Sequence, residues 1–104
     1  MRASKKSKLM NRGWKVGDAK EFLDLSAEEA ALIELRLKLS EGLKARRKRK
    51  RLTQHDLATA VQSSQSRVAK MESGDPTVSI DLLMRSLIAL GASRKDLARI
   101  IAPS

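Results

Sequence analysis

Serine and threonine residues stand immediately before five segments of the chain whose apolar residues recur at helical intervals. Side chains of this kind accept a hydrogen bond from a backbone N–H in the first turn, so they make good helix N-caps. No segment shows the strict alternation of apolar and polar residues that is typical of a half-buried strand. The pattern therefore predicts an all-α fold whose five helices begin after Ser26, Thr53, Ser64, Ser79 and Ser93.

The first of these helices is long, with an expected extent from Ser26 to about Arg49. Glu29 follows Ser26 by three residues, which is the arrangement of a capping box. An apolar stripe follows at Leu32, Leu35, Leu39 and Leu43. The N-terminal half carries more apolar surface than one small core needs, so we expect part of it to contact a partner, most simply a second copy. Candidates for that dimer surface are Leu32, Ile33, Ile100 and Ile101.

The length of 104 residues is that of one domain, and the composition favours an aliphatic core. Hydrophobic residues make up 41% of the sequence but aromatic residues only 2%, which suits small helices better than a β-sandwich. Residues 1–25 are basic, so we expect a largely flexible N-terminal arm there and the folded domain over residues 26–104. No apolar stretch is long enough for a membrane span or a secretory signal. We therefore expect a location in the bacterial cytoplasm.

The chain contains no cysteine and a single histidine, His55. A disulfide framework and a thiolate or multi-histidine metal site are therefore excluded. Paired carboxylates, a glycine-rich phosphate loop and a serine–histidine arrangement do not stand out either. We expect no catalytic residue, no metal and no cofactor, and thus a protein that is not an enzyme.

Positive charge exceeds negative charge, since 22 lysine and arginine residues face 12 acidic residues for a net charge of +10. Such an excess attracts polyanions, nucleic acid above all. The densest basic run, Lys44 to Arg51, leads directly into the start of the second helix. A merely solvated helix end is the alternative, but this position favours phosphate neutralisation by Arg47 and Arg49.

Two short helices over about residues 53–72, joined by a turn at Gln62 to Ser64, match a helix-turn-helix arrangement. The second helix would direct Val68 and Met71 toward the core. Its other side would present groups that can read base edges in the major groove, namely Gln65, Ser66, Ala69 and Lys70. Phosphate would bind at the two helix N-termini and beside them, through Thr53, Gln54, Ser64 and Arg67.

The stretch LTQHDLATAVQSSQSRVAKMESGDPTVSIDLLMRSLIALG resembles the lambda-repressor-like helix-turn-helix family, which is also described as Cro/C1-type or XRE. The resemblance extends over roughly Leu43 to Ala102. It implies a five-helix DNA-binding bundle, here with an extended first helix and a basic N-terminal arm. It also implies a phosphate contact for Gln54, a structural role for Glu72, and base contacts for Gln65, Ser66 and Lys70.

Three positions depart from the pattern of that family. Arg51 and Gln62 stand where the family commonly has glycine, and Ser63 stands where an aliphatic residue is common. A side chain at Gln62 would be strained if the backbone there required a positive φ. The departures concern local turn geometry and leave the expected fold unchanged.

These features together predict a sequence-specific regulator that binds double-stranded DNA. We expect a homodimeric repressor on a palindromic operator, located with the bacterial nucleoid. The long helix and the segment GWKVGDAKEFLDLS also look similar to small regulators that act as the antitoxin of a toxin–antitoxin pair. Such antitoxins bind the toxin and repress their own promoter. The alternative class is a protein-interaction adaptor that uses a helix-turn-helix fold without specific DNA binding.

Overall fold

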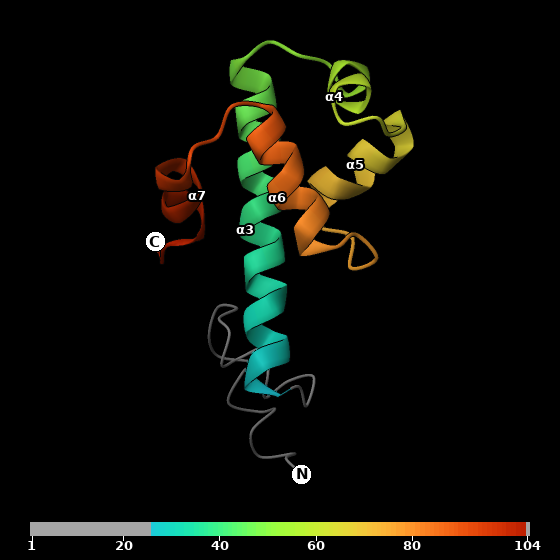
Figure 1. Ribbon diagram of the computed structural model, residues 1–104. Coiled ribbons are helices and arrows are strands. Elements are labelled where there is room, and N and C mark those ends of the chain that lie inside the picture. The colour runs from blue at the N-terminus through green and yellow to red at the C-terminus, as the bar shows by residue number, and fades with distance from the viewer. Residues whose placement is uncertain (1–25, 104) are drawn as a thin grey trace. The chain divides into compact units, whose positions relative to one another are not determined.

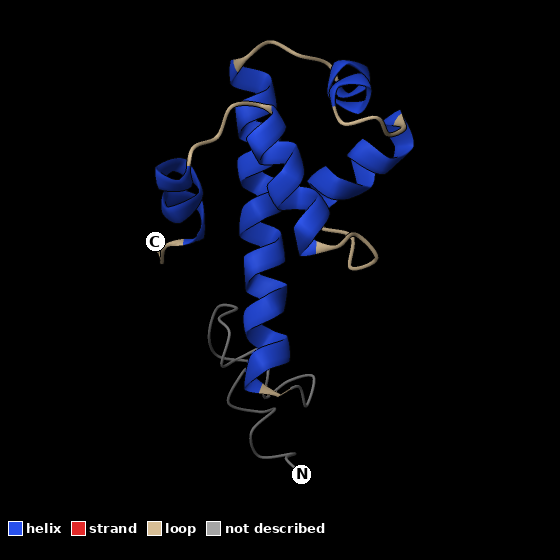
Figure 2. Cartoon of the chain, in the orientation of Figure 1, coloured by secondary structure: helices blue, strands red, loops and turns tan. Residues whose placement is uncertain are grey.

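The computed structural model describes residues 26–103, and within this part of the chain it contains five α-helices and no strand (Figures 1 and 2). The predicted all-α fold is therefore confirmed. The predicted arm, residues 1–25, lies outside the described residues. The helices are α3 (Ala27–Arg49), α4 (Gln54–Ala60), α5 (Gln65–Ser73), α6 (Ile80–Ala89) and α7 (Arg94–Ile101).

Each helix begins after the N-cap that the sequence predicts. At the start of α3, Ser26 Oγ accepts a hydrogen bond from the Glu29 N–H at 3.1 Å, and the Ser26 N–H donates to Glu29 Oε1 at 3.0 Å. The same reciprocal capping box forms at α4 and α7, while α5 and α6 have a serine cap alone. These local bonds satisfy N–H groups that have no partner inside the helix, so the sequence fixes where each helix starts.

Four of the helices also share one way of ending. In each case a backbone N–H just beyond the helix donates to the carbonyl five residues back, which is the Schellman motif. The motif requires a positive φ at the residue before that donor, and this residue is Arg51 (59°), Gln62 (56°), Gly74 (77°) or Gly91 (90°). Glycine adopts such a backbone freely, whereas a residue with a Cβ is strained there. The positive φ considered for Gln62 is thus confirmed, and Arg51 shares it.

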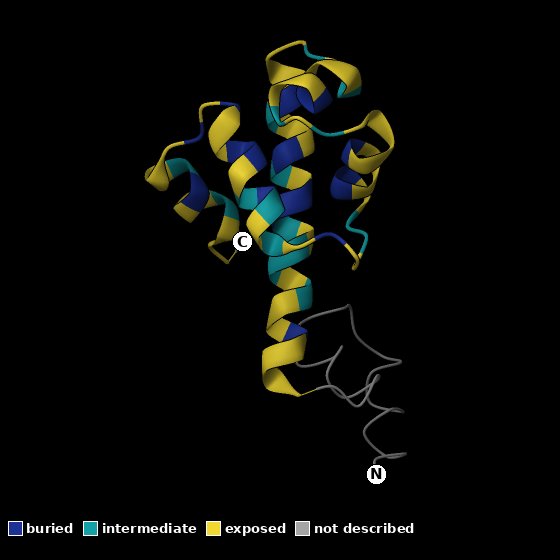
Figure 3. Ribbon diagram, turned by 45° about the vertical axis from the view of Figure 1, so that its right-hand side comes forward, coloured by how far each residue is buried: buried dark blue, intermediate teal, exposed yellow. Residues whose placement is uncertain are grey.

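Residues 35–103 form a bundle around an aliphatic core (Figure 3). The core takes its side chains from all five helices, and its centre holds Leu39, Leu43, Leu57, Val68, Met71, Leu83 and Leu87. Each of these seven is at most 1% exposed. Truncating one such leucine to alanine costs about 2–5 kcal/mol. This packing holds the two short helices α4 and α5, which would not be stable alone.

Helix α7 packs closely on α3 at a glycine. A Cβ added to Gly42 would lie only 3.0 Å from both Cδ1 and Cγ2 of Ile100. Lys38 Nζ also donates a hydrogen bond to the Ala102 carbonyl at 3.1 Å. The absence of a side chain at Gly42 therefore allows the last helix to approach the first.

Candidate nucleic-acid interface

Helix α5 has a buried side and an exposed side. Val68, Met71 and Glu72 are buried, and the first two are fully buried in the core. The four predicted base-reading residues are all exposed, namely Gln65, Ser66, Ala69 and Lys70. Amide, hydroxyl, methyl and ammonium groups on one exposed helical surface can between them contact every base type in a major groove. The structure thus leaves the predicted reading surface accessible.

The N-terminus of α5 is shaped by Ser64. Its Oγ accepts a hydrogen bond from the Arg67 N–H at 3.2 Å and lies 3.2 Å from Ser66 Oγ. The side chain of Arg67 is exposed beside this cap. The N–H groups of the first helical turn have no partner inside the helix, so together with Arg67 they can receive a phosphate oxygen.

The N-terminus of α4 differs in detail from the prediction. Thr53 Oγ1 accepts from the Asp56 N–H at 3.0 Å, and the Thr53 N–H donates to Asp56 Oδ2 at 2.8 Å. The Thr53 N–H is therefore occupied, and the free backbone donors begin at Gln54. The bond from the Thr53 backbone N–H, with a smaller contribution from the Thr53 side chain, lowers the pKa of the Asp56 carboxyl. Thr53 can contact phosphate only through its hydroxyl proton.

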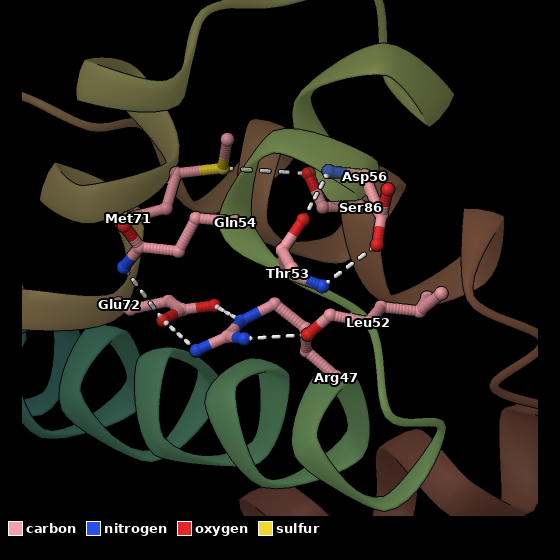
Figure 4. A network of polar contacts seen from close by, with 8 residues as sticks. All are labelled: Arg47, Leu52, Thr53, Gln54, Asp56, Met71, Glu72 and Ser86. Atoms are coloured by element: carbon pink, nitrogen blue, oxygen red, sulfur yellow. Dashed lines mark hydrogen bonds and ion pairs between the residues drawn. The ribbon is translucent and has the colours of Figure 1, made fainter.

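Arg47 lies inside the protein, whereas the sequence analysis predicts a phosphate contact for it. Its Nε and Nη2 donate to the two carboxylate oxygens of Glu72 at 2.5 and 3.0 Å, and its Nη1 donates to the Leu52 carbonyl at 2.7 Å (Figure 4). The side chains of Arg47 and Glu72 are only 10% and 3% exposed. Hydrogen bonding to Glu72 also raises the pKa of Arg47. Because its guanidinium nitrogens are occupied, Arg47 has a structural role and does not bind phosphate as predicted.

Gln54 joins the same network from α4. Its Nε2 donates to Glu72 Oε1 at 3.2 Å, so one carboxylate on α5 holds an arginine of α3 and an amide of α4 (Figure 4). Gln54 is half-buried, and its amide has a second N–H that can face a phosphate oxygen. The structural role of Glu72 is therefore to hold α4 in place against α5.

Arg49 is exposed at the C-terminal end of α3. It lines a pocket between α3 and α7 together with Arg46, Asp96 and Arg99. The remaining predicted site residues come together on α4, α5 and the turn between them: Thr53, Gln54, Ser64, Gln65, Ser66, Arg67, Ala69 and Lys70. Neither the pairing of Arg47 with Glu72 nor this pocket is predictable from local sequence patterns, because each joins residues that lie far apart in the chain.

Two short helices, α4 and α5, joined by the turn at residues 61–64 have the arrangement of a helix-turn-helix unit. A family model described as a helix-turn-helix domain matches residues 38–100, more than half of the chain. The chain therefore belongs to the helix-turn-helix domain family, and this membership indicates a DNA-binding regulator. No curated protein and no solved structure matches the chain significantly. None of the helices in residues 26–103 is long and apolar enough to cross a membrane.

Proposed function

We propose that the protein is a sequence-specific transcriptional regulator that reads double-stranded DNA with α5. The observation that carries the proposal is the exposure of Gln65, Ser66, Ala69 and Lys70 on a helix whose opposite side is locked into the core. A rigid mounting matters because base discrimination depends on hydrogen bonds with a defined geometry. Glutamine can pair with adenine, lysine can donate to guanine, and the alanine methyl can contact the thymine methyl.

Phosphate contacts from the two helix N-termini would set the position of α5 on the duplex. Gln54, Ser64 and Arg67 are accessible for this role, and Thr53 can add its hydroxyl. Such contacts orient the protein without reading sequence. The network of Glu72 with Arg47 and Gln54 supports the proposal, because it couples the phosphate-contacting end of α4 to the base-reading helix.

Within the helix-turn-helix class we propose a Cro/C1-type repressor that binds a palindromic operator as a homodimer. A single bundle covers one half-site, and a two-fold pair of bundles doubles the contacts. Leu32 and Ile101 remain 46% and 37% exposed, which suits a dimer surface. Ile33 is partly buried, and Ile100 already packs near Gly42, which leaves it less available. Ile88 is 56% exposed and extends the set of candidates.

Selection of bound duplexes from a random pool tests this function. We expect an enriched motif with two-fold symmetry. Changing Gln65 or Lys70 to alanine should then cost about 1–3 kcal/mol on that motif and relax the base preference at one position. Arg85→Gln, on the largely exposed face of α6, is the matched control and should leave binding unchanged. If no motif is enriched, the adaptor function is the better explanation. If the two alanine variants lose as much affinity for random DNA as for the motif, Gln65 and Lys70 do not read bases.

We propose an antitoxin role as a specialisation of the same repressor. Leu32 and Leu37 on α3 are each exposed apolar side chains, and each could contact a protein partner. Co-expression with the product of the adjacent gene tests this role. A toxin should arrest growth when expressed alone, and it should co-purify with this protein when growth is restored. A neighbouring product that is harmless and does not bind would remove the antitoxin role and leave the repressor intact.

We also propose that the protein is not an enzyme, that it needs no metal or cofactor, and that it works with the nucleoid in the bacterial cytoplasm. The proposal follows from the DNA-binding class and from a chain that lacks cysteine and has one histidine. DNA binding should accordingly be unchanged after treatment with a chelator. A loss of binding that added metal restores would contradict this part of the proposal.

A further inference from the structure

A pocket of about 180 Å³ opens between α3 and α7. Its polar wall consists of Arg46 and Arg49 from α3 with Asp96 and Arg99 from α7, and Gly42 and Ile100 lie in its apolar wall. The pocket is therefore large enough for a small anion with a short organic group.

The pocket contains more hydrogen-bond donors than acceptors. Its single carboxylate, Asp96, is already bonded through both oxygens. Oδ2 accepts from the Ser93 N–H at 2.9 Å and lies 3.2 Å from Arg46 Nη2, and Oδ1 accepts from Arg99 Nη2 at 2.8 Å. Arg46 Nε is buried and has no hydrogen-bond partner among the described residues. Arg49 likewise forms no ion pair within residues 26–103.

The charge of the pocket points to a dianion. Three guanidinium groups and one carboxylate leave two positive charges uncompensated. The planar fork of a guanidinium matches the oxygens of a phosphate group. We propose that this pocket binds the phosphate dianion, either free or as a small phosphate monoester whose organic part rests on the apolar wall.

The phosphates of bound DNA fit this pocket less well. A phosphodiester carries one negative charge, whereas the pocket has two charges to balance. In Figures 1 and 3, α7 and α5 lie on opposite sides of α3, so a duplex on the exposed side of α5 would lie away from the pocket. The proposed ligand site is therefore separate from the DNA-reading surface.

Amide NMR spectra of the full chain test the proposal. The protein would be titrated with inorganic phosphate and, separately, with glycerol 3-phosphate, at an ionic strength kept constant with sodium chloride. We expect saturable shifts at Gly42, Ala45, Arg49 and Arg99. Arg49→Gln removes a cation that has no protein partner among the described residues, so the fold should be kept while the affinity falls about tenfold or more.

Arg85→Gln, which removes an equal charge from α6, should titrate like the unmodified protein. A third titration with short duplex DNA separates the two sources of phosphate. Shifts at Gly42 and Arg99 that appear with DNA but not with either small phosphate would overturn the proposal. It would also fail if Arg49→Gln left the phosphate titration unchanged, or if chloride alone reproduced the shifts.

Discussion

Glu72 on α5 links α5 to α3 and α4 through side-chain hydrogen bonds. Its carboxylate accepts hydrogen bonds from Arg47 and Gln54, and its side chain is almost fully enclosed. A carboxylate taken out of water is stable only when charged partners replace its hydration. Because both carboxylate oxygens are engaged, the pair fixes a geometry in addition to any stability that it contributes.

The first prediction concerns this pair. Arg47→Met should cost about 3–5 kcal/mol of unfolding free energy, because it leaves the Glu72 carboxylate buried without its partner. The double variant Arg47→Met/Glu72→Met should recover most of that loss, because no unpaired charge remains. Urea denaturation of the four proteins of the cycle measures both effects. Losses that simply add would mean that the two side chains do not depend on each other.

A second prediction at the residue scale concerns Gln62, whose φ is 56°. A left-handed backbone costs a residue with a Cβ about 1–2 kcal/mol. Glycine removes that cost but gains about 0.4–1 kcal/mol of entropy in the unfolded chain. Gln62→Gly should therefore stabilise the protein by roughly 0.5–1 kcal/mol. Thr59→Gly, three residues earlier in helical backbone, should instead destabilise it by about 0.3 kcal/mol. Thermal denaturation of both variants decides the sign.

At the scale of the elements, the short helices depend on their neighbours more than on their own sequence. Helix α4 has seven residues and α5 has nine, and helices of that length are marginal in isolation. Their caps define where they begin and end, while the core supplies the free energy that keeps them helical. The contact of α7 with α3 also depends on packing between helices. Glycine at position 42 has a low helix propensity, but it allows Ile100 to approach α3 closely.

The third prediction tests that contact. Alanine is about 1 kcal/mol better than glycine inside a helix, but a Cβ at Gly42 would lie 3.0 Å from Ile100. We expect the clash to dominate, so that Gly42→Ala destabilises the protein. In an Ile100→Ala background the obstacle is absent, and the same change should stabilise the protein by up to about 1 kcal/mol. An effect of equal sign in both backgrounds would show that Ile100 does not determine the residue at position 42.

Across the whole molecule, the arginine side chains lie in three different environments. Arg47 is buried, Arg46, Arg49 and Arg99 surround the α3–α7 pocket, and Arg67 lies on the exposed side of the helix-turn-helix unit. A net charge of +10 raises the affinity for any polyanion, but only cations close to phosphate release counterions. The contribution of an arginine to DNA binding therefore depends on its place in the fold.

The fourth prediction follows from these placements. Arg67→Gln should weaken binding by a similar factor on all duplex sequences, and it should reduce the slope of log K against log salt by about one. Arg85→Gln should leave that slope unchanged, although it removes the same formal charge. Binding titrations at four or more salt concentrations measure the slopes. Equal slopes for the Arg67 variant and the unmodified protein would place Arg67 outside the phosphate contacts.

Features that depend on neighbours along the chain could be predicted from the amino-acid sequence. The capping residues marked the start of every described helix, and helical spacing separated Val68 and Met71 from the exposed Gln65 and Lys70. These features are predictable because an N-cap bond or a helical face involves residues only three or four positions apart. The positive φ at Gln62 could likewise be anticipated from the glycine that is common there.

The environments of the clustered arginines, in contrast, follow from the packing of the helices. Arg47 and Arg49 lie in one basic run and cannot be distinguished by spacing, yet one is buried against Glu72 and the other faces α7. Twenty-five residues separate Arg47 from Glu72, so their pairing depends on how α5 packs against α3. Contacts over such separations arise from the packing of the whole core, and no local pattern of residues encodes them.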